Sequence, residues 1–368
     1  MTMRRYIPKD IQELTRWYER FISPLSLVGG FLVDNFILLK RVDVPLTSAV
    51  FLTHFAIVGA GTLFLAGIEG GRIRDSRLMR LVPFVPVAMQ FSFGGLFSGF
   101  VTLYARSATY AGAWIFIVII GIIALGNERF LRFAHRVSLR LTLIFVALFA
   151  FLTFFLPLMM HRISMMLFIA AGLIAFGLVS FFAILVSLIA PTTWHEYRWA
   201  TMRGIVIAFV VFNALYFTDL IPPLPLALKD AGVYHQITRN TDGSYVLKGE
   251  SAAWYASFLP GGETIHLVAG ESAYVFTAVF APTSLEAPVL HVWQRYDDTA
   301  KVWETVGTVS FTISGGREGG YRGYSAKYKP APGLWRVNVE TQEGRLIARV
   351  KFTVVDATTS PALVETEK

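Results

Sequence analysis

The feature that most constrains the fold of this chain is a series of long apolar segments between residues 21 and 221. They lie in a chain of 368 residues whose hydrophobic content is 54%. A helix rises about 1.5 Å per residue, so about 20 apolar residues cross the hydrocarbon core of a bilayer. We therefore predict seven transmembrane helices over residues 22–221, with spans near 22–40, 46–68, 81–104, 109–126, 141–160, 164–190 and 203–221.

The cations between these segments alternate in number from loop to loop. Of the 19 Lys and Arg residues before residue 219, 15 lie in one set of alternate loops, and the other set holds only Lys40, Arg41, Arg106 and Arg162. Cytoplasmic loops are enriched in Lys and Arg, and the alternation keeps its phase only if all seven segments span. We predict a multi-pass protein of the bacterial inner (cytoplasmic) membrane, with its N-terminus in the cytoplasm and its C-terminal domain periplasmic in a Gram-negative bacterium.

The N-terminal residues 1–21 contain arginines but no apolar core of the kind that a cleavable signal peptide needs. Ile11, Leu14, Tyr18 and Phe21 recur instead at helical spacing. This pattern predicts a cytoplasmic amphipathic helix that lies at the membrane interface with its aromatic rings at headgroup level. A solvated helical lead-in is the alternative interpretation.

The chain changes character after the last predicted span. Pro222, Pro223 and Pro225 cannot continue a helix, so residues 222–232 are interpreted as a proline-rich junction. The polar, turn-rich sequence that follows predicts an extracytoplasmic β-domain over residues 233–357. Residues 358–368 are expected to form a flexible tail.

Among the polar residues of the predicted spans, we single out Asp34, Asn35, His54, Gln90 and Asn213. Polar and ionisable groups at membrane depth are costly, so they are candidates for a functional site. Asp34, His54 and Asn213, with Asn35, would share one depth in the outer leaflet, where they could relay protons or bind a cation or a polar ligand. The alternative is that these side chains form hydrogen bonds between helices and hold the bundle together.

Several chemistries are absent from the sequence. The chain has no cysteine, which excludes disulfides, thiolate metal sites and thiol catalysis. It has no GxxxxGK[ST], GxSxG or HExxH motif, and no predicted span contains an interior lysine for a retinal Schiff base. Its cations form short blocks between apolar runs, which indicates loop orientation rather than a nucleic-acid partner. We expect no enzymatic activity, no cofactor and no metal.

The C-terminal domain shows the alternation of an all-β fold. Short runs rich in β-branched and aromatic residues are separated by segments such as "SGGREGG", "KPAPG" and "TQEG". Such spacing predicts an Ig-like β-sandwich. The expected strands are 272–281, 288–296, 301–313, 321–328, 333–341 and 345–355.

The last two expected strands can be aligned as a hairpin. In this alignment Trp335, Val337 and Val339 occupy one face and oppose Val350, Ala348 and Leu346. The other face would then place Arg336 opposite Arg349, with Lys351 continuing the row. Like charges directly opposite each other are unfavourable. An anion between the two arginines would relieve their repulsion, and it could be either a carboxylate of a neighbouring strand or an outside ligand.

Three segments of this domain carry a resemblance to a known family. "HVWQRYD" at 291–297, "YRGYSAKY" at 321–328 and "PGLWRVNVETQEGRLIARVKFTV" at 332–354 resemble the C-terminal module of an uncharacterised bacterial family, domain of unknown function 2914. The matching positions are His291, Trp293, Arg322, Ser325, Gly333, Trp335 and Val337. Glu343 and Gly344 stand where the family has an acidic-Gly turn. The resemblance implies an architecture and brings no known activity.

The motif residues suggest a ligand-binding surface. The candidates are aromatic, cationic or polar side chains on neighbouring strands: His291, Trp293, Arg295, Arg322, Tyr324, Ser325, Arg336 and Arg349. Together they would form a shelf for a sugar, a glycan phosphate or a carboxylate, held by stacking and cation–π contacts. The alternative is structural. In that interpretation the tryptophans anchor the core, His291 is hydrogen-bonded, and the arginines cover aromatic rings.

From these observations we predict a non-enzymatic membrane protein embedded in the lipid bilayer. Its β-sandwich would recognise an envelope glycan, an anionic ligand or a membrane-protein partner. The alternative function is a transporter or receptor that uses the polar site at Asp34, His54 and Asn213.

Overall fold

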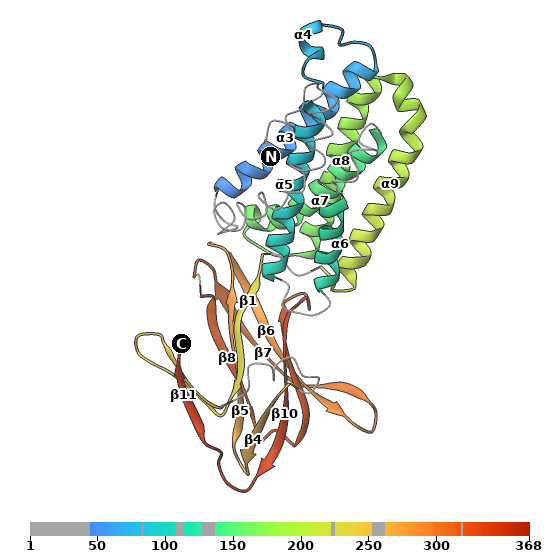
Figure 1. Cartoon of the computed structure of the whole chain (residues 1–368). Helices are drawn as coiled ribbons and strands as arrows, with labels where there is room; N and C mark the ends of the chain where they lie inside the picture. The colour runs from blue at the N-terminus through green and yellow to red at the C-terminus, as the bar shows by residue number, and fades with distance from the viewer. Residues whose placement is uncertain are drawn as a thin grey trace, which may run out of the picture. The chain divides into compact units, whose positions relative to one another are not determined.

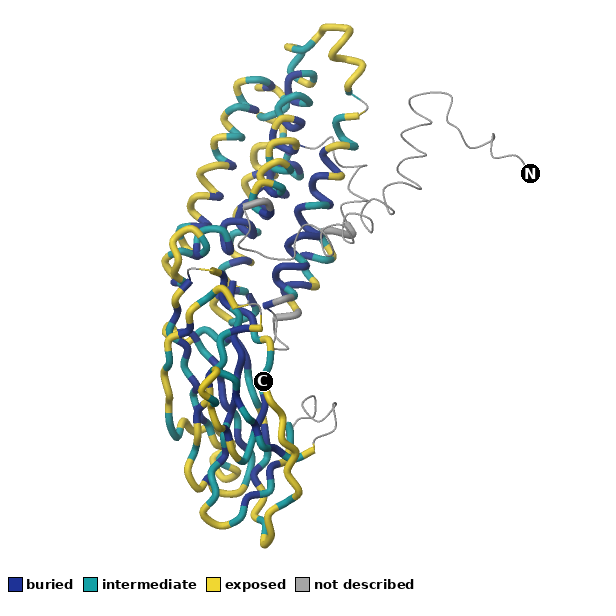
Figure 2. Tube along the Cα trace, turned by 90° about the vertical axis from the view of Figure 1, so that its left-hand side faces the viewer, coloured by how far each residue is buried: buried dark blue, intermediate teal, exposed yellow. Residues whose placement is uncertain are grey.

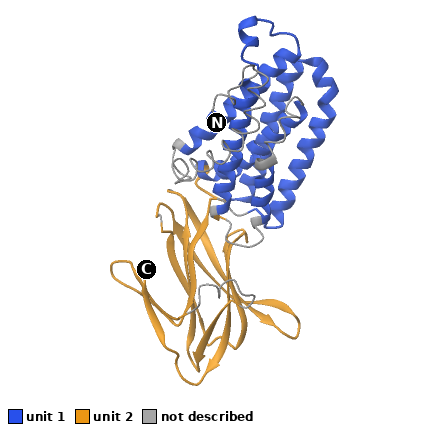
Figure 3. Ribbon diagram, viewed as in Figure 1, with its two compact units in different colours: residues 1–105, 114–159, 164–221 blue, residues 106–113, 160–163, 222–368 orange. Residues whose placement is uncertain are grey.

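The computed structural model describes residues 45–82, 84–107, 113–126, 137–221, 225–251, 262–283, 285–317 and 319–368. The predicted interfacial helix, the first predicted span, and Asp34 and Asn35 lie outside these ranges. The chain divides into a helical unit and a β unit, and the boundary after the last helix falls between Ile221 and Pro222 (Figure 3).

Seven helices form the described part of the helical unit (Figure 1): α3 (Pro45–Glu69), α4 (Ser76–Met79), α5 (Phe84–Ser107), α6 (Ala113–Gly126), α7 (Val137–Met160), α8 (Met165–Ile189) and α9 (Pro191–Phe217). Among the described residues, five of them (α3, α5, α7, α8 and α9) are long and apolar enough to cross a membrane. The predicted span at 109–126 is represented by α6, which has 14 residues. The last helix begins at Pro191 rather than near residue 203.

The apolar composition of these helices places large rings at their contacts. α7 is the most buried of the five long helices, and α8 and α9 are the least buried. Phe149 of α7 stacks on Phe212 of α9, with 4.6 Å between the ring centroids. At one end of the bundle, Arg140 of α7 is 3% exposed and lies 2.7 Å from a carboxylate oxygen of Glu69 on α3. A buried guanidinium is therefore paired within the unit.

The described part of the β unit contains three sheets. One has the strand order β1 (Ala227–Tyr234), β5 (Ser272–Phe280), β8 (Tyr321–Tyr328). The second has five strands in the order β4 (Glu263–Val268), β10 (Leu346–Ala357), β9 (Gly333–Thr341), β6 (Glu286–Asp297), β7 (Val302–Ser314). The third has the order β11 (Leu363–Glu367), β3 (Tyr245–Glu250), β2 (Gln236–Arg239). Among the described strands, only β4 and β10 pair in parallel.

These sheets pack as layers with β5 in the middle one. A core that includes Trp293, Trp335 and Phe352 joins strands of the five-stranded sheet to Val275 of β5. A second core joins Phe276 of β5 to β2 and β3. Successive residues of a strand point to opposite faces, so β5 buries both of its faces. Figure 2 shows the buried residues in the middle of this unit and the exposed ones around it.

The strands agree with the alternation of the sequence, but the pairing of the last hairpin does not agree with the prediction. The strands 321–328 and 333–341 have the predicted bounds. Trp335, however, opposes Phe352 rather than Val350, and the register shifts between Leu346 and Ala348. The predicted opposition of Arg336 and Arg349 is therefore wrong. One residue of the displacement is already present where Leu346 opposes Glu340 rather than Val339, and the β-bulge after Leu346 adds the other, which alternation alone cannot reveal.

The C-terminal residues were expected to be a flexible tail, yet residues 363–367 form β11 along β3. Lys368 exchanges backbone hydrogen bonds with Tyr245, and its ammonium group pairs with the carboxylate of Asp230. The β fold also begins earlier than residue 233, because β1 starts at Ala227 within the predicted junction. Both corrections arise from strand pairing between segments that are distant in the sequence.

Candidate functional site

Three of the predicted ligand-binding residues meet inside the β unit. His291 is 0%, Trp293 is 1% and Ser325 is 4% exposed. The Oγ of Ser325 accepts a hydrogen bond from Nε1 of Trp293 at 2.9 Å and lies 2.8 Å from Nδ1 of His291. The Nε2 of His291 lies 2.9 Å from Oγ1 of Thr277. These contacts satisfy a set of polar groups in the core, and they place the three side chains away from any surface ligand.

Strand pairing explains why this network is buried. Thr277 belongs to β5, His291 and Trp293 to β6, and Ser325 to β8, so the contacts join two facing sheets. Burial lowers the pKa of His291 to about 4. Its imidazole is thus neutral near pH 7, and one ring nitrogen donates while the other accepts. The geometry is that of a structural polar core.

Arg295, Arg322 and Tyr324 do not extend this cluster. Arg295 donates from Nη2 to the carbonyl of Pro332 at 3.2 Å. Arg322 and Tyr324 lie on the face of β8 opposite to Ser325, because they occupy alternate positions of the strand. Tyr324 is 39% exposed, and its ring lies 6.0 Å from that of Tyr245. The structure therefore does not bring the eight predicted residues together into one shelf.

A different grouping forms on the outer face of the five-stranded sheet. Gln294, Arg336 and Lys351 oppose one another across β6, β9 and β10, and Asn338 and Arg349 form the next row. The Nε of Arg336 donates to Oε1 of Gln294 at 2.7 Å. The Nε of Arg349 donates to Oδ1 of Asn338 at 2.8 Å. The Nε hydrogen bond of each arginine thus helps to fix the orientation of its guanidinium group.

An aromatic pair flanks these rows. The guanidinium carbon of Arg336 lies 4.3 Å from the centroid of the Trp303 ring, and that ring lies 5.2 Å from the ring of Tyr296. A cation over a tryptophan face is a favourable contact that also fixes the orientation of the guanidinium. We name this surface the polar face; it comprises Gln294, Tyr296, Trp303, Arg336, Asn338, Arg349 and Lys351.

The intramembrane candidates that the structure describes lie on three helices. The ring of His54 on α3 contacts α5, where a Cβ at Gly95 would come within 2.7 Å of its Nε2. Gln90 is buried on α5. Asn213 donates its amide to the carbonyl of Phe209 on its own helix at 2.8 Å. Among the described residues, no hydrogen bond joins His54 to Asn213.

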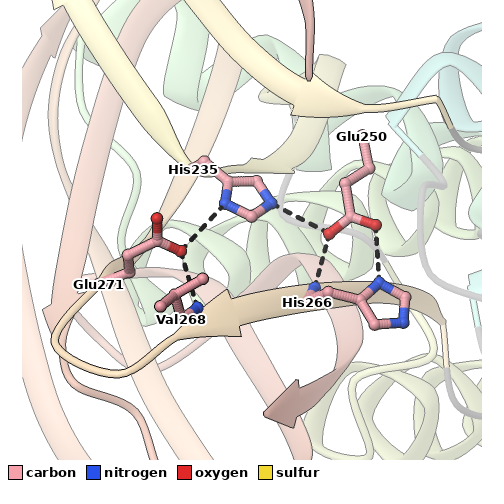
Figure 4. A network of polar contacts seen from close by, with 5 residues as sticks. All are labelled: His235, Glu250, His266, Val268 and Glu271. Carbon is pink, nitrogen blue, oxygen red and sulfur yellow. Dashed lines mark hydrogen bonds and ion pairs between the residues drawn. The ribbon is translucent and has the colours of Figure 1, made fainter. Parts of the chain in front are cut away.

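A further cluster of titratable groups was not predicted from the sequence (Figure 4). Glu250 lies between two histidines: its Oε1 is 3.0 Å from Nε2 of His235 and its Oε2 is 2.8 Å from Nδ1 of His266. The Nδ1 of His235 lies 3.7 Å from Oε2 of Glu271. The four residues come from separate segments of the chain, and no local spacing identifies them as a group.

The chain architecture explains this cluster, which we call the edge cluster. β4 is an edge strand, and two of its outward N–H groups are bonded to side chains: that of His266 to Glu250 at 2.6 Å, and that of Val268 to Glu271 at 2.9 Å. Burial raises the pKa of Glu250, but hydrogen bonds from the backbone and ring of His266 and from His235 outweigh it, so the pKa is lowered. Among the described residues no group of three or more His, Asp or Glu could hold a metal ion.

Comparison with known proteins identifies part of this region. Residues 286–354 match a family described as "Protein of unknown function (DUF2914)". They form a DUF2914 domain. The match confirms the resemblance suggested by the motif residues. The DUF2914 domain includes every residue of the polar face and three members of the buried network: His291, Trp293 and Ser325.

Other comparisons add no functional information. A search of the curated proteins finds no match to this sequence. Among solved structures, the alkylpurine DNA glycosylase AlkC of Pseudomonas fluorescens, bound to DNA containing an abasic site analog, aligns at 11% identity over 94% of this chain and 87% of that chain. The TM-score is 0.23, so this alignment supports no statement about fold or activity.

Proposed function

We propose that this chain is a non-enzymatic protein of the bacterial inner membrane whose β-domain recognises an anionic ligand, such as an acidic envelope glycan or an anionic segment of a partner. The N-terminus would be cytoplasmic and the β-domain periplasmic. Five long apolar helices and the alternation of cations between the apolar segments support this placement. A C-terminal alkaline phosphatase fusion tests it, because the enzyme would be active only if the domain is exported.

The observation that supports recognition is the arrangement of the polar face. Arg336 lies over Trp303, and its Nε is bonded to Gln294. Arg349 and Lys351 lie on the same face within one row of Arg336. Guanidinium groups that are fixed in direction bind carboxylates and phosphates with little loss of entropy, and indole and phenol rings stack on sugars. The polar face combines oriented guanidinium groups with aromatic rings.

The experiment is a binding assay with the full chain in lipid nanodiscs. The probes are oligosaccharides that bear a uronic acid or a phosphate, each with a neutral counterpart. We expect the acidic members to bind, and Arg336→Gln or Trp303→Ala to weaken binding about tenfold, since each removes a contact of about 1–2 kcal/mol.

A matched control is available elsewhere on the domain. Arg317, which is exposed, also lies over an aromatic ring, with its guanidinium carbon 5.7 Å from the centroid of Tyr321. Arg317→Gln removes the same charge and the same type of contact and should leave affinity unchanged. Equal binding of acidic and neutral probes, or equal loss in the Arg317 and Arg336 variants, would contradict the proposal.

One observation favours the alternative function. The Nδ1 of His54 is buried and has no hydrogen-bond partner among the described residues. A buried imidazole nitrogen of this kind could exchange a proton or bind a polar ligand at membrane depth. Proteoliposomes that contain the full chain and a pH-sensitive dye test this function. Proton flux that His54→Ala abolishes would favour transport, and an absence of flux would count against it.

A further inference from the structure

The two edge strands of the five-stranded sheet differ in how well they are protected against pairing with a further strand. At one edge the outward N–H groups of His266 and Val268 on β4 are bonded to the carboxylates of Glu250 and Glu271. The other edge is β7, which has 13 residues, Val302–Ser314, and which, among the described strands, pairs with β6 alone. An edge strand exposes a row of backbone donors and acceptors that can pair with another strand. Long edge strands are therefore normally protected.

The first half of β7 has features that prevent it from pairing with another strand. The register with β6 shifts between Trp293 and Gln294, which leaves Val306 as the extra residue of a bulge. The ammonium group of Lys327 donates to the carbonyl of Val306 at 2.8 Å. Glu304 adds a charge to the exposed strand. Bulges and charges are common means of preventing edge pairing.

The second half of β7 lacks these features. From Gly307 to Ser314 the sequence "GTVSFTIS" contains no charged residue and no proline. Thr308, Val309, Ser310 and Thr312 are exposed. Within the part of the chain that the structure describes, the backbone of Thr308–Ile313 makes no hydrogen bond other than those with β6. In an antiparallel pair, every second residue directs its N–H and C=O away from the neighbouring strand. This half of the edge is therefore open to another strand.

We propose that Thr308–Ile313 pairs antiparallel with the same segment of a second copy of this chain, so that two five-stranded sheets join across a twofold axis. The segment suits self-pairing because it is uncharged, and no like charges oppose each other across the axis. Thr308, Ser310 and Thr312 alternate on one face, and Thr–Ser pairs across strands are favourable. The contact is isologous and closes as a dimer. Six residues of paired strand extend about 20 Å.

Cysteine scanning tests the geometry directly, because the natural chain contains no cysteine. Single cysteines are placed at each position from 308 to 313 of the full chain, and the membranes are treated with a mild oxidant. A residue on the twofold axis faces its own copy at about 5 Å between Cα atoms, which permits a disulfide. A residue two positions away is separated from its copy by about 13 Å, which does not.

The expected pattern is a strong dimer band at one position or at two neighbouring ones, falling to background within two residues. Thr264→Cys is the control, because Thr264 is also an exposed threonine on an edge strand of the same sheet, on the protected β4. It should give background cross-linking. Uniform cross-linking along 308–313, cross-linking equal to that of Thr264→Cys, or capture of a different protein overturns the proposal.

A charge substitution supplies a second measurement. Ser310→Lys places two ammonium groups near each other across the axis, so the dimer fraction in size-exclusion chromatography with light scattering should fall several-fold. Thr264→Lys adds the same charge at the protected edge and should leave the dimer fraction unchanged. Both substitutions are on exposed strand positions, and an unchanged thermal unfolding midpoint confirms that the variants fold. A folded Ser310→Lys variant that dimerises like the natural chain contradicts the proposal.

Discussion

The hydroxyl of Ser325 lies 2.9 Å from the indole nitrogen of Trp293, and both side chains are buried. The same hydroxyl contacts His291, so one serine satisfies polar groups from two neighbouring positions on the facing strand. In this way β8 is joined to β6 by side chains as well as by apolar packing. This relationship gives the first prediction.

Ser325→Ala should destabilise the β-domain by roughly 1–3 kcal/mol, because it leaves the buried N–H of Trp293 without an acceptor. Thermal or denaturant unfolding of the full chain, followed by tryptophan fluorescence, measures the change. Ser314→Ala is the control, since this serine is exposed on β7. A surface substitution of this kind changes stability by less than about 0.5 kcal/mol. Equal stability of the two variants would show that the network contributes little.

The low pKa of His291 predicts a pH dependence of stability. The folded-state pKa is about 4, below the ordinary value of 6.5, because burial disfavours the charged ring. Between these values the unfolded chain binds a proton that the folded chain does not, so stability falls as the pH drops from 6.5 to 4. The total loss is roughly 3 kcal/mol. Unfolding midpoints across this range should slope downward, and His291→Gln should flatten the slope.

The edge cluster predicts a second pH effect at lower pH. The pKa of Glu250 is lowered, so its contribution to stability is complete above the ordinary pKa of a glutamate and is lost as the pH falls through the lowered value. Glu250→Gln removes that loss and weakens the bond to the backbone N–H of His266. Hydrogen exchange of β4 should then accelerate relative to β9, which lies inside the same sheet. Equal exchange of β4 in the variant and the natural chain would contradict this role.

The ion pair between Arg140 and Glu69 predicts that substitutions of these two residues have non-additive effects on the stability of the helical unit. Glu69→Gln leaves the guanidinium of Arg140, which is 3% exposed, without its carboxylate, at a cost of about 3 kcal/mol. Arg140→Gln together with Glu69→Gln should recover part of that cost, because the uncompensated charge is removed. A double-mutant cycle by thermal unfolding in detergent measures the interaction. Additive effects of the two substitutions would show that the pair is not coupled.

Local patterns in the sequence determined the elements of this protein. The length of the apolar runs predicted the helices α3, α5, α7 and α8 to within a few residues, because a span must match the thickness of a bilayer. Alternation and the "KPAPG" turn predicted β8 and β9 with their observed bounds. The burial of Trp335 also follows from alternation, since the period of a strand assigns each side chain to one face.

The tertiary structure decided which residues meet. The last hairpin is displaced by two residues from the predicted register, one at the turn and one at a bulge near Ile347, so Arg336 opposes Lys351 and contacts Trp303 instead of opposing Arg349. The C-terminal residues form β11 because they pair with the edge of β3. His235, Glu250, His266 and Glu271 converge only after the sheets have packed. The physical reason is that periodicity is a local property of a chain, whereas register, edge pairing and buried hydrogen bonds depend on contacts between distant segments.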